Sequence, residues 1–151
     1  MNWLDRLDAV QARLESLATR DLSGLTAPDE ATGEQWDAGQ VWAHLAEFGN
    51  YWLGELDKVL AGAASFGRVK SDAARIAAIE AGRKLPVATH IEIVRRSMDA
   101  LRTRLESMTD DDWARVSHHS TLGDLTIDDQ MQHFHVGHYE EHADQLESLD
   151  R

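Results

Sequence analysis

The sequence contains no cysteine and only two prolines among its 151 residues. Without cysteine there is no disulfide framework, no thiolate metal site and no cysteine nucleophile, so any metal ligands must be nitrogen or oxygen atoms. Basic residues are also scarce, because 15 lysines and arginines stand against 27 acidic residues, a net charge of −12. This charge argues against nucleic acid or an anionic membrane surface as the main partner.

Long apolar runs are absent as well. No stretch approaches the ~20 apolar residues that span a bilayer, and the first residues lack the basic and then apolar pattern of a signal peptide. We therefore expect a cytoplasmic protein without a membrane partner. The length favours one domain over residues 1–151, since no repeat or linker divides the chain.

The apolar residues that are present recur at three- and four-residue steps, which is typical of helices that bury one face. The pattern predicts long helices at about residues 2–20, 38–60, 86–108 and 127–149. A short helix at 71–83 and a helical turn around Trp113 are further possibilities. No segment shows a sustained apolar–polar alternation, so we predict an all-α fold without a sheet, a four-helix bundle with long crossover connections.

Two of the predicted long helices begin with capping residues. Asp37 precedes the second helix and has Gln40 three residues later, which resembles a capping box. Thr126 precedes the fourth helix, with Asp129 at the equivalent position.

Histidine is concentrated in the last predicted helix, where four of the eight histidines fall within residues 133–142. At about 100° per residue, His135, His138 and His142 share one face, close to the apolar residues of that helix. His133 points roughly 160° away and is expected in solvent. The histidine face is therefore partly the buried face.

The spacing of these histidines suggests a metal site. His138 and His142 form the i,i+4 pair that binds one ion from a single helix, whereas His135 and His142 are about 10.5 Å apart along the axis. His135 with His138 is possible but is the less usual spacing. His44 lies on or beside the inward stripe of the second helix and adds a third nitrogen, which leaves a coordination position open.

We predict His44, His138 and His142 as the ligands, with His135 in a supporting or pocket-lining position. The ligand set alone does not choose among zinc, nickel, iron and manganese. A single histidine on an apolar face is more often a satisfied core residue. If three histidines are buried without a metal ion, however, their ring nitrogens still need hydrogen-bond partners.

Charged residues near the histidines are weaker candidates. Glu47 and Glu141 lie one turn after His44 and His138, so each is a candidate to orient a ligand or to accept a proton. Acidic residues on a bundle are more often simply solvated. Arg68 and Arg75 are candidates to hold an anionic substrate or the carboxylate of a thiol, although surface arginines usually have no such role.

The remaining histidines receive no role. His118 and His119 fall in a predicted loop and are expected to be exposed, and His90 lies near the start of the third helix.

Three motifs together resemble the DinB/YfiT-like family of metal-binding four-helix bundles. They run from Trp36 to Ala46, from Leu122 to Asp129 and, as His-x-x-x-His-x-x-Gln-Leu, from His138 to Leu146. In this order and spacing the resemblance covers nearly the whole chain. It implies a bundle with two crossovers, a homodimer, and a zinc or nickel ion on the three predicted ligands. Some relatives are transferases or isomerases that use a low-molecular-weight thiol such as mycothiol or bacillithiol.

Three classes of function follow from these observations. The leading one is a metal-dependent enzyme that acts on a small molecule, by thiol S-transfer or a related detoxification step, with metal-assisted hydrolysis as the alternative reaction. The second class is a non-catalytic metal-binding module of the stress response. The third is a structural bundle that binds no metal.

Overall fold

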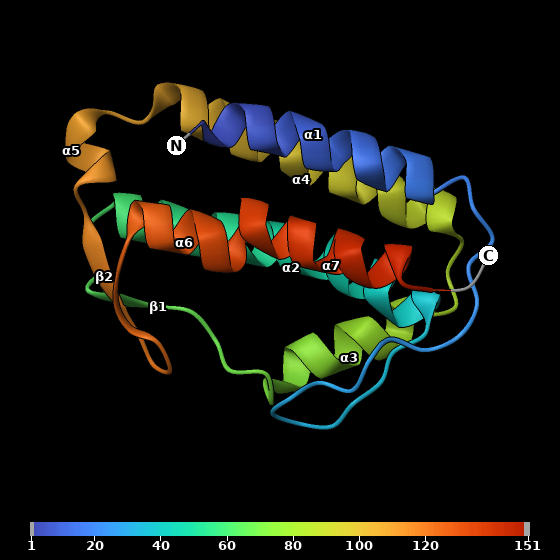
Figure 1. Cartoon of the computed structure of the whole chain (residues 1–151). Helices are drawn as coiled ribbons and strands as arrows, with labels where there is room; N and C mark the ends of the chain where they lie inside the picture. Colours follow the sequence, from blue (N-terminus) through green and yellow to red (C-terminus); the bar gives the residue numbers. More distant parts are fainter. Residues whose placement is uncertain (1, 150–151) are drawn as a thin grey trace.

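The computed structural model describes residues 2–149 (Figure 1). The ends of the predicted domain, residues 1, 150 and 151, lie outside the described residues. The helices are α1 (Trp3–Leu17), α2 (Ala38–Leu60), α3 (Ala73–Gly82), α4 (Val87–Ser107), α5 (Asp110–Trp113), α6 (Ile127–Phe134) and α7 (Val136–Glu147). No helix in the described part of the chain is both long and apolar enough to cross a membrane.

Four long helical segments form the bundle, which confirms the predicted fold class. α1 packs against α4 and α7, and α2 packs against the same two helices from the other side. In Figure 1, α1 and α7 run in one direction while α2 and α4 run in the other. Because α2 and α4 run in the same direction, the connection between them, which contains β1 and α3, returns along the length of the bundle. The connections from α1 to α2 and from α4 to α7 each join diagonally opposite helices at one end, and α2 and α7 lie side by side near the cavities described below.

The core fills the space between the four helices. Its fully buried side chains come from all of them: Leu7, Val10 and Leu14 on α1, Leu45 and Phe48 on α2, Val94 and Met98 on α4, and Ala143 and Leu146 on α7. Each set recurs at three- or four-residue steps, as the sequence pattern requires. The ligand-bearing faces of α2 and α7 are thus continuous with the faces that hold the bundle together.

Both predicted capping boxes are present. The Asp37 carboxylate accepts from the backbone N–H of Gln40, whose side chain accepts in return from the backbone N–H of Asp37. Thr126 and Asp129 make the same reciprocal pair at the start of α6. These caps fix where α2 and α6 begin.

The prediction that the chain contains no sheet is wrong. Three short strands, β1 (Ser65–Phe66), β2 (Val116–His119) and β3 (Gly123–Thr126), form a small sheet in the order β1-β2-β3. β2 pairs in parallel with β1 and antiparallel with β3. The strands of two to four residues are too short to show a sustained pattern.

In β2 the buried positions are also polar. Ser117 and His119 face inward while Val116 and His118 face outward, so the usual apolar alternation is inverted. The expected exposure of His119 is therefore wrong, since only 4% of its surface is accessible, whereas His118 is exposed as predicted.

The last predicted helix is interrupted. α6 ends at Phe134 and α7 begins at Val136, because His135 between them has φ −122° and ψ −105°. Gly137 permits the close approach of the two pieces: a Cβ atom there would lie 1.9 Å from the carbonyl oxygen of Gln132. The break changes the rotational phase of α7, so a single helical wheel does not describe residues 127–149.

Candidate metal centre

Three imidazoles from two helices converge on one point. His44 lies on α2, and His138 and His142 lie one turn apart on α7. The Nε2 atom of His138 is 3.1 Å from that of His44 and 2.9 Å from that of His142. The potential ligand atoms of the three all lie within 4.8 Å of one another. The structure thus brings together the three histidines that the sequence predicts as ligands.

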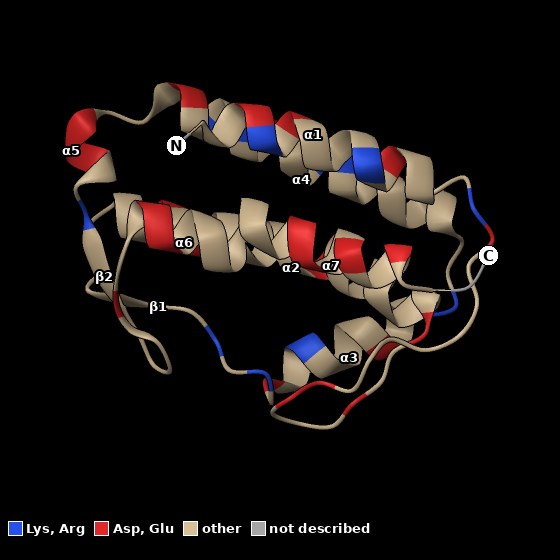
Figure 2. Ribbon diagram, in the orientation of Figure 1, with Lys and Arg blue, Asp and Glu red and all other residues tan. Residues whose placement is uncertain are grey.

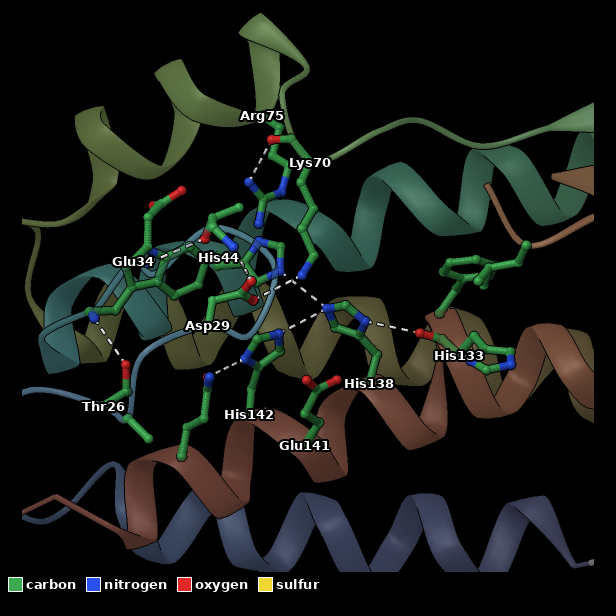
Figure 3. Close-up of a pocket in the computed structure, with 16 residues that line it drawn as sticks. Thr26, Asp29, Glu34, His44, Lys70, Arg75, His133, His138, Glu141 and His142 are labelled. Atoms are coloured by element: carbon green, nitrogen blue, oxygen red, sulfur yellow. Dashed lines mark hydrogen bonds and ion pairs between the residues drawn. The ribbon is translucent and has the colours of Figure 1, made fainter. Parts of the chain in front are cut away.

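The opposite nitrogen of each ring has a protein acceptor, and Figure 3 shows the one that His133 provides for His138. The Nδ1–H of His44 donates to Glu47 over 2.9 Å, and that of His142 donates to the side-chain oxygen of Gln145 over 2.6 Å. His138 instead donates to the backbone carbonyl of His133 over 3.0 Å. Each partner holds the proton on Nδ1 and leaves a lone pair on Nε2, which is how metal-binding histidines are commonly oriented.

Burial keeps the three imidazoles neutral. It holds the pKa of His44 and His138 well below the usual value and lowers the pKa of His142 to about 4. Three uncharged Nε2 lone pairs therefore face one another at contact distance, an arrangement that a shared cation would relieve. The donor set is all nitrogen and includes no carboxylate, so it fits a divalent metal ion and leaves room for a further ligand.

Aromatic rings surround the histidines. Phe48 packs against His138 with ring centroids 4.3 Å apart. Trp36, which precedes α2, stacks on His142 at 6.2 Å and meets His44 edge-on at 5.2 Å. The loop that carries Trp36 is closed by two hydrogen bonds with Thr26, at 2.8 and 2.9 Å. These rings restrict the side-chain rotation of the histidines and exclude water from their far sides.

The break between α6 and α7 explains the partner of His138. Glu47 and Gln145 each lie three residues after the histidine that they orient. Glu141 has the same spacing from His138, yet the His138 ring turns instead to the carbonyl of His133, five residues earlier. An uninterrupted helix would use that carbonyl for the backbone N–H of residue 137, so the interruption makes it available.

A cavity of about 250 Å³ opens onto the three histidines. Beside them it is lined mainly by polar and charged side chains, of which Thr26, Asp29, Glu34, Lys70, Arg75, Glu141 and Gln145 are the most prominent. Figure 3 shows Lys70 and Arg75 extending toward His44 from the opposite side of the cavity. A ligand in this space would meet both the Nε2 atoms and two cationic groups.

The two predicted glutamates differ in position. Glu47 lies behind His44, where it also pairs with Arg68; burial raises its pKa and the Arg68 charge offsets part of that rise. Glu141 lines the cavity and keeps an exposed side chain, although desolvation by the surrounding protein raises its pKa. Of the two, Glu141 has the position of a proton acceptor, and Glu47 that of an orienting group.

A second cavity, of about 560 Å³, shares His44, His138, Lys70, Arg75, Leu122, Phe134 and Thr32 with the first. Its further lining is largely apolar and includes Trp52, Val69 and the buried His119. Figure 2 shows that the segment from β1 into α3, which contributes Arg68, Lys70 and Arg75, is basic although the whole chain is acidic.

His135 lies apart from the three converging histidines. It is buried at the helix break and does not line either cavity, and burial lowers its pKa to about 3. A charge on His135 would still act on His138, whose pKa it would depress. Its predicted supporting position is thus near the ligands but outside the cavities.

Several residues near the site were given no individual role by the sequence analysis: Trp36, Asp29, Lys70, His119 and Gln145. Gln145 had a usable signal, because its spacing from His142 equals that of Glu47 from His44. The others come from loops or a short strand, for which helical periodicity carries no information.

A four-helix bundle whose second and last long helices bring three histidines together has the architecture of a class of metal-binding bundles. The DinB superfamily sequence profile matches residues 6–146. The chain therefore belongs to the DinB superfamily. No match is found among curated protein sequences.

Two solved structures share this fold. YfiT from Bacillus subtilis, described as a probable metal-dependent hydrolase with an unusual four-helix bundle topology, superposes with a TM-score of 0.76 at 17% identity, over 96% of this chain and 82% of YfiT. A mycothiol-dependent maleylpyruvate isomerase matches with a TM-score of 0.72 at 14% identity. That match covers 97% of this chain but 61% of the isomerase, so the isomerase is the longer protein.

Proposed function

We propose that the protein is a cytoplasmic, divalent-metal-dependent enzyme that acts on a small-molecule substrate. Its reaction is a thiol S-transfer that uses a low-molecular-weight thiol, or a related detoxification step. His44, His138 and His142 hold the ion, and zinc or nickel suits this ligand set. The observation that carries the proposal is the convergence of three oriented Nε2 atoms at the wall of an open cavity. The fold shared with a mycothiol-dependent enzyme supports the choice of a thiol.

A divalent ion in this site would lower the pKa of a bound thiol or water, so that a nucleophile forms at neutral pH. The chain's own residues orient the metal ligands and bind the substrate. Glu47, Gln145 and the His133 carbonyl keep the imidazoles in the binding orientation. Arg75 and Lys70 face the same space and can hold an anionic group beside the histidines.

Hydrolysis is the second candidate, and Glu141 is the observation that favours it. Its carboxylate lies in the cavity wall with a raised pKa, which brings it closer to the range of a general base at neutral pH. YfiT, of the same fold, is described as a probable metal-dependent hydrolase. In this reaction Glu141 would take a proton from the attacking water.

The open cavity supports an enzyme over a non-catalytic metal-binding module. A closed site would have its remaining coordination positions filled by a side chain. Here Trp42 is buried in the core, Trp52 forms a wall of the second cavity, and the three-histidine group contains no carboxylate. A substrate can thus approach the Nε2 atoms.

Elemental analysis of the protein without a histidine tag tests the metal site. We expect about one equivalent of zinc or nickel in the parent and none in a variant with both His44→Ala and His138→Ala. The cobalt-substituted parent is then titrated with N-acetylcysteine, and a new sulfur-to-cobalt absorption band is expected. A parent that takes up no metal on reconstitution would overturn the proposal, while metal uptake without the band would exclude thiol transfer and leave hydrolysis.

We also propose a homodimer, as the resemblance to the family implies. Sedimentation equilibrium should give twice the mass of the 16.9 kDa chain. A monomer at all concentrations would contradict this part of the proposal.

A further inference from the structure

The second cavity differs in character from the first. Trp52 and Phe134 stack in its wall, with ring centroids 4.1 Å apart and an angle of 15° between their planes. His119 stacks on Phe134 at 4.9 Å and lies 6.3 Å from Trp52, so the three rings form one cluster. These rings offer a rigid apolar surface that begins at the histidine site, because Phe134 and His138 line both cavities.

Two large apolar side chains at this cavity are exposed to solvent. Val69 and Leu122 each leave 46% of their surface accessible, and both line the second cavity. They lie in separate loops, before α3 and between β2 and β3. Apolar side chains that face a cavity from two loops indicate an apolar occupant.

A cation lies where the two cavities meet. Arg75 is half-buried, donates to the backbone carbonyl of Lys70 over 2.9 Å and lies over the Trp36 ring at 5.6 Å. Among residues 2–149 it makes no ion pair with a carboxylate, whereas Lys70 pairs with Asp29 and Arg68 pairs with Glu47. A half-buried guanidinium with free N–H groups facing a cavity is suited to a carboxylate or phosphate of a ligand.

We propose that the small-molecule substrate is an amphipathic organic acid. Its anionic group binds Arg75 beside the metal ligands, and its apolar part occupies the second cavity against Trp52, Phe134 and Leu122. The volume of about 560 Å³ accommodates a phenyl ring or a short alkyl chain. This inference rests on the proposed function, because it names the substrate class for the same histidine site.

Calorimetric titration with three probes tests both halves of the proposal. The probes are 4-phenylbutyrate, its neutral amide and butyrate, each titrated into protein whose metal content has been measured. We expect 4-phenylbutyrate to bind at least tenfold more tightly than either of the others, because only it has both the charge and the ring. Equal binding of the acid and the amide would overturn the inference.

Variants assign the two halves to their residues. Arg75→Gln should remove the preference for the acid over the amide, and a double variant with Val69→Ser and Leu122→Ser should weaken 4-phenylbutyrate but leave butyrate unchanged. Arg96→Gln, on the exposed face of α4, is the matched control and should bind as the parent does. An Arg75→Gln variant that keeps the full acid preference would also overturn the inference.

The metal measurement separates this inference from the proposed function. A parent that contains metal but shows no acid preference contradicts the substrate class alone. A parent that takes up no metal but shows Arg75-dependent binding of 4-phenylbutyrate supports the acid site and overturns the metal-dependent reaction. A parent with neither property contradicts both.

Discussion

The histidines of the site lie on two long helices, whereas most of the groups that face them across the cavities come from loops. We call α2 and α7 the helical wall, and residues 26–36, 68–75 and 119–122 the loop cover. The helical wall is fixed by core side chains such as Leu45 and Leu146, which are fully buried. The loop cover is held by polar contacts, for example the hydrogen bonds between Thr26 and Trp36 and the ion pair between Lys70 and Asp29.

This difference separates two properties of the site. Metal binding requires ligand atoms at fixed distances, and the bundle core provides them. Substrate selection requires groups that can differ between relatives without disturbing the core, and loops are suited to that role. We therefore expect changes in the helical wall to act mainly on metal affinity and stability, and changes in the loop cover to act mainly on ligand preference.

The largest effect is expected from His138→Ala in the helical wall. His138 contacts both other histidines through its Nε2 atom, so its loss leaves only two of the three predicted ligand nitrogens. Zinc affinity, measured by competition with a chelator, should fall by roughly 100-fold or more, beyond the effect of losing an orienting partner. His118→Ala, at an exposed position, is the control. Unchanged affinity in His138→Ala would show that the ligand assignment is wrong.

Gly137→Ala should destabilise the helical wall at its break. The added Cβ would lie 1.9 Å from a backbone oxygen, which cannot move away as a side chain would, so a loss of about 3 kcal/mol is expected. Gly54→Ala on α2 meets no atom within 4 Å and should instead stabilise the helix by about 0.5–1 kcal/mol. Urea unfolding measures both. Similar effects of the two substitutions would contradict the described packing.

Glu47→Gln tests the contact between the wall and the cover. Glu47 accepts from His44 and pairs with Arg68, so removing its charge should lower zinc affinity by roughly 10- to 100-fold. Glu141→Gln makes the same substitution in the cavity wall and should leave zinc affinity unchanged. If both variants lose affinity equally, the assignment of Glu47 as the orienting carboxylate does not hold.

Acid should weaken the fold through His135, which immediately precedes α7 of the helical wall. Burial lowers the folded-state pKa of His135 from 6.5 to about 3. The unfolded chain takes up a proton that the folded chain refuses, so stability is present above the unfolded pKa and is lost as pH falls from about 6.5 toward 3. At pH 5 this loss is roughly 2 kcal/mol relative to pH 7.

Urea midpoints of chelator-treated protein at pH 7 and pH 5 measure this dependence. His135→Asn should show a smaller loss between the two pH values than the parent does. Identical losses in the parent and the variant would mean that His135 does not remain neutral in the folded protein.

The helices of the helical wall and their histidines could be predicted from the sequence. The second helix was predicted with the bounds that the structure shows, because a strong apolar period and a capping box coincide at Asp37. The grouping of His44 with His138 and His142 followed from helical spacing and the family resemblance, and the structure places their Nε2 atoms together. Where regular helices carry the chemistry, periodicity was a sound guide.

Helical periodicity predicted neither the structure of the loop cover nor the break between α6 and α7. A wheel that treats residues 127–149 as one helix places His135 on the ligand face, but the backbone at His135 ends α6 and shifts the phase of α7. The exposure of His119 was mispredicted because a strand of four residues, with polar side chains inward, gives no readable period. That strand is formed by pairing between distant segments, such as Ser65 with His118.

The position of Trp36 has an optical consequence. Its indole stacks on His142 and meets His44 edge-on, so its fluorescence should be quenched when cobalt or nickel occupies the neighbouring nitrogens. Because Trp36 ends one loop of the cover, the same emission would also report any movement of that loop away from the histidines. A single native chromophore can therefore follow both the filling of the site and the opening of the cover, with Trp36→Phe to identify its share among the five tryptophans.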